Sequence, residues 1–182
     1  VSIRPHLKAA TMHSRIAALR LVIAATLLFG AGLAVAGPTY TLTNLGTLGA
    51  ASSGAGINEL GQATGWTYDA SGDIRAFLWD VGTMRNLGWP ESWGTASNDA
   101  GQVTGSSVVS QTGTHAFVYR DGAMIDIGTL GGFHSSGWGI NNAGQVTGQA
   151  LTARGEPHAF IYSGGVMRDL GTFGGVYSAG FA

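Results

Sequence analysis

The sequence predicts an all-β protein made of repeats of about 40 residues with four short strands each, and two recurring signatures support this. The pentapeptide Gly-Gln-(Ala/Val)-Thr-Gly occurs three times, and a run of Ala-Phe, an aliphatic residue and an aromatic residue follows each copy. Both signatures recur at steps of 40 and then 43 residues. A fixed period of this size, with several short apolar runs inside it, is typical of stacked supersecondary units. The residues that define the motif are Asn58, Gly61, Gly65, Phe77, Trp79, Asn98, Gly101, Gly105, His115, Phe117, Tyr119, Asn141, Gly144, Gly148, His158, Phe160 and Tyr162.

The four strands are read most clearly in the unit at 127–169. Its apolar runs lie near 135–141, 145–148, 159–162 and 166–170, and clusters of Gly, Asn, Asp or Ser separate them. Such punctuation is typical of strands joined by hairpins. No segment after residue 36 has a convincing helical period of apolar residues. The other units are expected at 45–86 and 87–126, with a partial unit at 170–182.

Two elements of the unit have a clear physical basis. Asn58, Asn98 and Asn141 each begin a four-residue turn that ends in Gly. Asn bonds its own backbone two residues on, and Gly accepts a positive φ, so these residues are interpreted as turn formers. In the Ala-Phe run both faces are apolar. Phe77 points to one side of the strand and Ala76 to the other, and the two residues that follow them are apolar as well. Such a strand is expected between two packed layers.

The repeat resembles the HAF-repeat family of extracellular bacterial proteins, named for the triplet present here at His115–Phe117 and His158–Phe160. The resemblance spans about residues 40–182 and includes Leu-Gly-Thr-Leu-Gly-Gly and Ile-Asn-x-x-Gly-Gln-Val-x-Gly elements. Arg75 replaces the His in the first copy. Period and strand count also resemble β-propeller blades, although the WD signature is missing. The resemblance therefore implies an extracellular, partial β-propeller-like repeat and no particular activity.

Three units and the opening of a fourth fall short of the roughly four blades that close a propeller ring. We therefore expect a piece of a longer protein, an assembly with other chains, or an open stack of sheets. Residues 40–45 resemble the strand expected at 166–170 and are suited to complete a blade begun elsewhere. Unpaired sheet edges predict self-association.

The first 36 residues read as a secretory signal peptide. Arg15 and Arg20 precede sixteen uncharged residues that end Ala34-Val35-Ala36, which predicts cleavage before Gly37. A retained anchor is the alternative, but the run is shorter than the roughly 20 residues that a spanning helix needs. A start at Met12 would make residues 1–11 an over-extended reading frame. The mature protein is thus expected to be secreted, with no stable membrane span.

Charge and cysteine content limit the classes of partner and of chemistry that the sequence allows. The leader contains four of the nine basic residues and none of the ten acidic ones, so the mature chain has a formal charge of −5 and no Lys. Such a chain has little means of neutralising phosphates, so nucleic acid is not an expected partner. The absence of Cys excludes disulfides and thiol chemistry.

The sequence offers no catalytic residue, metal site or cofactor motif. His115 and His158 occupy equivalent positions and are interpreted as structural residues that open a strand. Asp126, His134 and Ser135 are close in sequence, but a catalytic triad is defined by geometry. No HExxH pair, nucleophile elbow, phosphate loop or Ca²⁺ loop is present.

A ligand site is expected where the pattern breaks. Trp89 and Trp93 flank Glu91 in a segment that reads Thr-Leu-Gly-Gly elsewhere, and aromatic faces beside a carboxylate suit sugar rings or an extended peptide. Alternatively, both Trp rings fill space between blades. The sequence therefore predicts a secreted, non-catalytic binding or surface-interaction module for a glycan or a protein. A structural envelope or adhesin component is the nearest alternative, and a propeller-type glycan hydrolase or lyase the more distant one.

Overall fold

The computed structural model describes residues 39–110 and 113–181. The chain divides into two compact units, residues 1–43 and 44–182. Of the first unit only residues 39–43 are described, and they form neither helix nor strand; the predicted signal peptide lies outside the described residues. In the described part of the second unit, the regular secondary structure consists of β-strands only, which confirms the all-β prediction.

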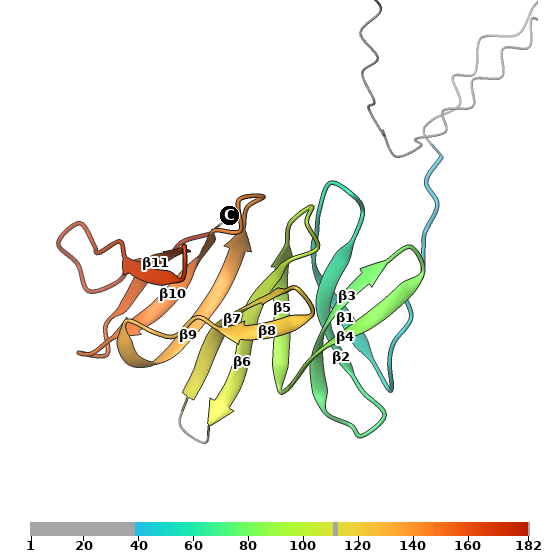
Figure 1. The fold of residues 1–182 in the computed structure, drawn as a ribbon, viewed down its shortest axis with the longest axis horizontal. Coiled ribbons are helices and arrows are strands. Elements are labelled where there is room, and N and C mark those ends of the chain that lie inside the picture. Colours follow the sequence, from blue (N-terminus) through green and yellow to red (C-terminus); the bar gives the residue numbers. More distant parts are fainter. Residues whose placement is uncertain (1–38, 111–112, 182) are drawn as a thin grey trace, which may run out of the picture. The chain divides into compact units, whose positions relative to one another are not determined.

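The described strands form three consecutive sets of four (Figure 1). Neighbouring strands within each set pair antiparallel. The first set is β1 (Ser52–Ile57), β2 (Ala63–Tyr68), β3 (Ile74–Asp80) and β4 (Thr83–Pro90). The second is β5 (Ser92–Ser97), β6 (Val103–Ser110), β7 (Gly113–Arg120) and β8 (Ala123–Asp126). The third is β9 (Gly131–Ile140), β10 (Val146–Thr152), β11 (Pro157–Ser163) and β12 (Val166–Asp169).

The sets form two open sheets. The first set is a four-stranded sheet in the order β1-β2-β3-β4. The second and third sets share one sheet, in the order β12-β11-β10-β9-β7-β6-β5, with β8 paired to β7. A single parallel pair, Thr114 with His134, joins these two sets, and the amide of Thr114 donates to Nδ1 of His134 at 3.1 Å. The sequence did not predict this join, which depends on β9 beginning as early as Gly131.

The hairpin between the second and third strands of each set explains the constant spacing of the two signatures. The last Gly of each pentapeptide lies opposite the Phe of the Ala-Phe run, as in the pair Gly105 and Phe117. The Thr before that Gly donates its hydroxyl to the carbonyl of the same Phe, at 2.7 to 3.0 Å in the three sets. The small residue lets the first strand approach, and the hydroxyl fixes the register. The equivalent pairs are Gly65 with Phe77 and Gly148 with Phe160.

Strand β7 is buried on both faces, as predicted for the Ala-Phe runs. Phe117 and Tyr119 belong to one hydrophobic core, together with side chains of β3, β4, β6 and β8. Ala116 and Val118 belong to a second core, with side chains of β10 and β11. In β3 and β11, the Ala and the Phe of the run are likewise buried. Adjacent residues of one strand therefore connect two cores.

The Asn-led turns form as predicted and also connect neighbouring sets. Oδ1 of each Asn accepts the amide two residues on, at 3.0 to 3.1 Å, and the closing Gly has φ between 71° and 77°. In addition, Nδ2 of Asn58 donates to the carbonyl of Asn98 at 2.7 Å, and Nδ2 of Asn98 to the carbonyl of Asn141 at 2.9 Å. The sequence showed the recurrence of these residues but not this second role.

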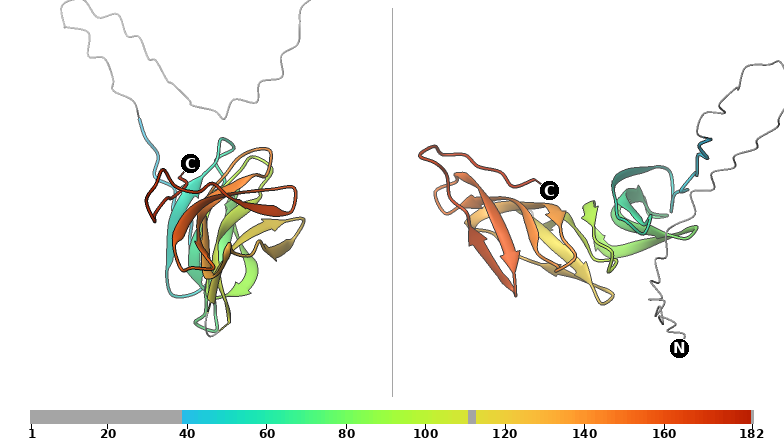
Figure 2. Two further views of the ribbon diagram at one scale, coloured as in Figure 1. Left: turned by 90° about the vertical axis from the view of Figure 1, so that its left-hand side faces the viewer. Right: turned by 90° about the horizontal axis from the view of Figure 1, so that it is seen from above.

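The first strand of one set packs on the second strand of the set before it: β5 on β2, and β9 on β6. The right-hand view of Figure 2 shows the sets following one another in sequence order, from blue-green to red. Gly94 lies directly on the Thr64 hydroxyl, and a Cβ at Gly94 would come within 2.5 Å of that oxygen. The hydroxyls of Ser92 and Ser135 accept the amides of Ala76 and Ala116, at 2.9 and 2.8 Å. A shared pattern, Ser-x-Gly followed by Asn, thus makes both contacts.

Candidate functional site

The segment 89–93, in which the repeat pattern is interrupted, forms a corner between the first and second sets. Between the pairs Arg75–Pro90 and Phe77–Asn86, β4 places three residues opposite one residue of β3, so Trp89 lies outside the regular ladder. Glu91 alone separates β4 from β5 and has a positive φ of 46°. Pro90 has no amide to donate, and its carbonyl accepts the Ser107 hydroxyl at 3.3 Å. This hydrogen bond joins the corner to β6.

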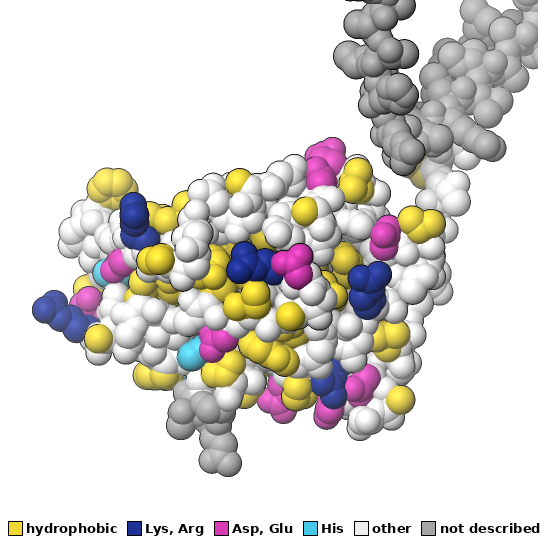
Figure 3. Space-filling model, viewed as in Figure 1, with side chains coloured by type: hydrophobic (Ala, Val, Ile, Leu, Met, Phe, Trp, Pro, Cys, Tyr) yellow, Lys and Arg dark blue, Asp and Glu magenta, His cyan; other side chains and the backbone are white. Residues whose placement is uncertain are grey.

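Trp89 lines an open groove of about 370 Å³ beside this corner. Its other lining residues are Pro90, Val108, Val109 and Asp126. Trp89 also packs against the first core and is partly buried, which holds its ring in place, whereas Val109 is 40% exposed. Figure 3 shows hydrophobic side chains gathered on the face that carries β8, with charged side chains scattered among them. The groove is therefore apolar, with one carboxylate in its lining.

The three residues predicted to bind ligand do not all line this groove. Trp89 lines the groove, but Glu91 and Trp93 are not among its lining residues. Within the described residues, the ring pairs in contact are Trp66–Tyr68, Phe133–His134 and Trp138–Phe181, so Trp89 and Trp93 do not stack. Glu91 is exposed, and its carbonyl accepts the amide of Val108 at 3.0 Å. Val108, Val109 and Asp126 join Trp89 only through folding, so no local pattern could identify them.

Asp126 is fixed by two hydrogen bonds. Its Oδ2 lies 2.8 Å from Nδ1 of His115, and its Oδ1 accepts the amide of Gly128 at 2.7 Å. Each carboxylate oxygen has a further lone pair, so the group can still accept a hydroxyl or amide from a ligand. The groove is thus able to orient a polar ligand as well as contact an apolar one.

The His of each HAF triplet pairs with a carboxylate eleven residues later. His158 Nδ1 lies 2.9 Å from Asp169 Oδ2, which matches the pair in the second set. In the first set Arg75 bonds two other carboxylates, Asp69 at 2.7 Å and Asp73 at 2.9 Å. Because these pairs tie the third strand to a neighbouring strand or loop, they agree with the structural interpretation of His115 and His158.

Acid should lower the free energy of unfolding by protonating Asp169 in the third set. Burial raises the pKa of this carboxyl, but the His158 hydrogen bond, the Gly171 amide and the charge of His158 lower it overall below its ordinary value of 3.8. A carboxyl whose pKa is lower in the folded state stabilises the fold above its unfolded pKa, and this contribution is lost as pH falls through that range. Asp169→Asn should therefore flatten the acid limb of stability measured by denaturant unfolding at a series of pH values. The change should be at most about 1 kcal/mol because solvent screens the exposed carboxylate of Asp169. Identical acid limbs for the two proteins would contradict this.

The residues that suggest a hydrolytic triad do not form one. Both hydrogen-bonding roles of the Ser135 hydroxyl are occupied, since it accepts from the Ala116 amide and donates to the Gly128 carbonyl at 2.5 Å. Asp126 is bonded to His115 and not to His134. His134 accepts the amide of Thr114. These side chains serve the join between β7 and β9.

Across the described residues, no group of three or more His, Cys, Asp or Glu side chains is placed to hold a metal ion. The same residues contain no helix of the length and apolar character needed to cross a membrane. No protein-family model matches the chain, no curated protein matches it, and no solved structure matches it.

Proposed function

We propose that this protein is a secreted, non-catalytic β-repeat module that binds a glycan or a protein surface in the groove beside Trp89. The observation that carries the proposal is the composition of this groove: a fixed indole, three apolar neighbours and the carboxylate of Asp126. An indole offers broad apolar contact at low entropic cost, and a few placed polar groups orient the ligand. A sugar ring suits this combination, because one face is apolar and its hydroxyls donate to a carboxylate.

The proposal includes a partial β-propeller-like arrangement of HAF-type units, one unit for each set of strands. Its support is the recurrence of the same contacts at steps of 40 and 43 residues, such as the bonds from Asn58 to Asn98 and from Asn98 to Asn141. Face-to-face packing of β5 on β2 and of β9 on β6 agrees with adjacent blades. Export rests on the leader sequence that ends at Ala36.

Trp89→Ala should abolish most ligand binding. The probe is a printed array of oligosaccharides, followed by titration of the best-bound sugar into the purified full chain. We expect an affinity loss of at least about tenfold, or about 1.4 kcal/mol, because the indole is the largest contact in the groove. Asp126→Asn should also weaken binding, and it retains an oxygen for the Gly128 amide.

Trp93→Ala is the matched control, since Trp93 does not line the groove. It should leave sugar affinity unchanged, and thermal melts would show that each variant is folded. An equal loss from Trp93→Ala would favour the platform predicted from sequence over the groove. Wild-type protein that binds no printed sugar, and no peptide on a parallel array, would contradict the proposed function.

A further inference from the structure

The two contacts between successive sets show which kind of strand can pack on the outer face of the third set. At each contact, a Gly of the incoming first strand covers a Thr hydroxyl of the preceding second strand. An incoming Ser hydroxyl accepts the amide of the Ala in the preceding third strand. The preceding Asn donates its side-chain amide to the incoming Asn carbonyl. The incoming segments are residues 92–98, which contain β5, on the first set and residues 135–141, which contain the end of β9, on the second.

Among the described residues, the segment 178–181 covers part of the outer face of the third set. The hydroxyl of Ser178 accepts the amide of Ala159 at 2.8 Å, and Gly180 lies on the hydroxyl of Thr147. The ring of Phe181 stacks on Trp138, with ring centroids 4.7 Å apart. Residues 178–181 thus reproduce the beginning of an incoming strand.

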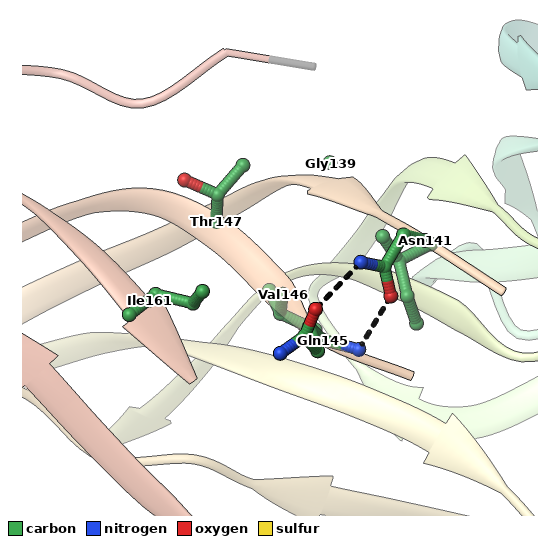
Figure 4. A pocket seen from close by; sticks show the side chains of 7 residues that line it. Gly139, Asn141, Gln145, Val146, Thr147 and Ile161 are labelled. Carbon is green, nitrogen blue, oxygen red and sulfur yellow. Dashed lines mark hydrogen bonds between the residues drawn. The ribbon is translucent and has the colours of Figure 1, made fainter. Parts of the chain in front are cut away.

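An open pocket of about 140 Å³ lies beside this segment (Figure 4). Gly139, Ile140, Asn141, Gln145, Val146, Thr147 and Ile161 line it. Asn141 is exposed and its Nδ2 bonds Gln145 of its own turn at 2.8 Å, whereas Asn98 is only 3% exposed and also reaches the next set. Thr147 is half-buried, while its counterparts Thr64 and Thr104 are fully buried.

The opposite end of the second unit of the chain presents the matching strand. β1 carries Ser52 and Gly54, followed by Asn58, in the same spacing as β5 and β9. A Cβ at Gly54 would meet no atom within 4 Å, and most of β1 is exposed. Among the described residues, the carbonyl of Asn58 accepts the amide of Gly61 and no Asn side chain.

We propose that β1 of a second copy of this chain docks on β10 and β11 and displaces residues 178–181. In that position Ser52 accepts the amide of Ala159, Gly54 covers Thr147, and Asn141 donates to the carbonyl of Asn58. The segment that follows Gly54 continues over the pocket that residues 178–181 leave open. The interface is heterologous, with different surfaces on the two copies, so association closes a ring or extends head to tail.

The exchange is a competition. The tethered segment 178–181 has a high effective concentration and contributes the Phe181–Trp138 stack, whereas β1 contributes a longer strand and the Asn contact. Association should therefore depend on protein concentration. Weakening the segment should favour association, and blocking β1 should prevent it.

Sedimentation velocity of the full chain over a range of concentrations tests this with two opposing variants. Gly54→Val fills the open space on β1 and should weaken association by at least about tenfold, while its melting temperature stays close to wild type. Gly180→Val forces a side chain against Thr147 and should strengthen association by a similar factor. Equal association of both variants and wild type would overturn the proposal and indicate another surface.

A mixing experiment distinguishes this interface from a symmetric one. Ile161→Glu places a carboxylate in the pocket, where the cross-strand neighbour Arg168 makes it tolerable to the fold. At a concentration at which wild type just associates, Gly54→Val and Ile161→Glu should each be largely monomeric alone, because each weakens one half of every contact. Mixed together, they should form a heterodimer, since each supplies the half that the other lacks. A mixture that stays monomeric while wild type associates would contradict head-to-tail docking.

Discussion

Phe117→Ala should destabilise the protein by roughly 3 to 5 kcal/mol, the usual cost of removing a fully buried aromatic ring. Phe117 is 0% exposed and belongs to the core that side chains of both sheets share. The cavity would lie in β7, whose opposite face belongs to the second core. Because packed neighbours close such a cavity only in part, we expect both cores to loosen together. Denaturant unfolding followed by Trp fluorescence measures the loss.

His115→Ala is the matched comparison in the same triplet. The His115 ring is partly exposed, and its bond to Asp126 is a surface pair, so its removal should cost about 1 kcal/mol or less. Small and equal losses from the two substitutions would mean that β7 does not connect the cores. Separate transitions for the two sheets in Phe117→Ala would show that the cores are independent.

Local chemistry is what the sequence could predict. The Asn-led turns depend on one side chain and one positive φ within four residues, so the turn at Asn98 and Gly101 can be predicted from these two residues alone. Burial of the Ala-Phe runs on both faces follows from their lack of any polar alternation. The groove proposed to bind ligand was different, because Val108, Val109 and Asp126 reach Trp89 only after β6 and β8 have packed beside β4. Of the predicted ligand residues, only Trp89 lines it.

The contacts between sets could not be predicted from the sequence either, and the reason is physical. A recurring Asn or Gly is explained completely by its own turn or strand, so its repetition gives no sign of a second partner. Asn98 bonds its own turn through Oδ1 and the next set through Nδ2. The same double role applies to the glycines of the first strands, which cover Thr hydroxyls of the preceding set.

Gly105→Ala should be about as damaging as the loss of a core ring, although it adds only one methyl group. Gly105 pairs with Gly94 beside a bulge, and a Cβ there would overlap the carbonyl of Trp93. The obstacle is backbone, which no side-chain rotation can relieve. β5 cannot withdraw either, since its other side packs on β2. We expect a loss of about 3 kcal/mol or more, at the upper end of overpacking effects.

Two other glycines make this prediction specific. Gly65→Ala meets the same overlap, with the carbonyl of Ser53, but β1 is exposed and can shift, so its loss should be clearly smaller. Gly54→Ala meets no atom within 4 Å, so it should be neutral or stabilise slightly by restricting the unfolded chain. Equilibrium unfolding of the three variants should therefore rank their losses as Gly105, then Gly65, then Gly54. If Gly105→Ala cost no more than Gly65→Ala, the packing of β5 on β2 would not hold the bulge closed, because a strand held on both sides must resist the added methyl group more than a strand held on one.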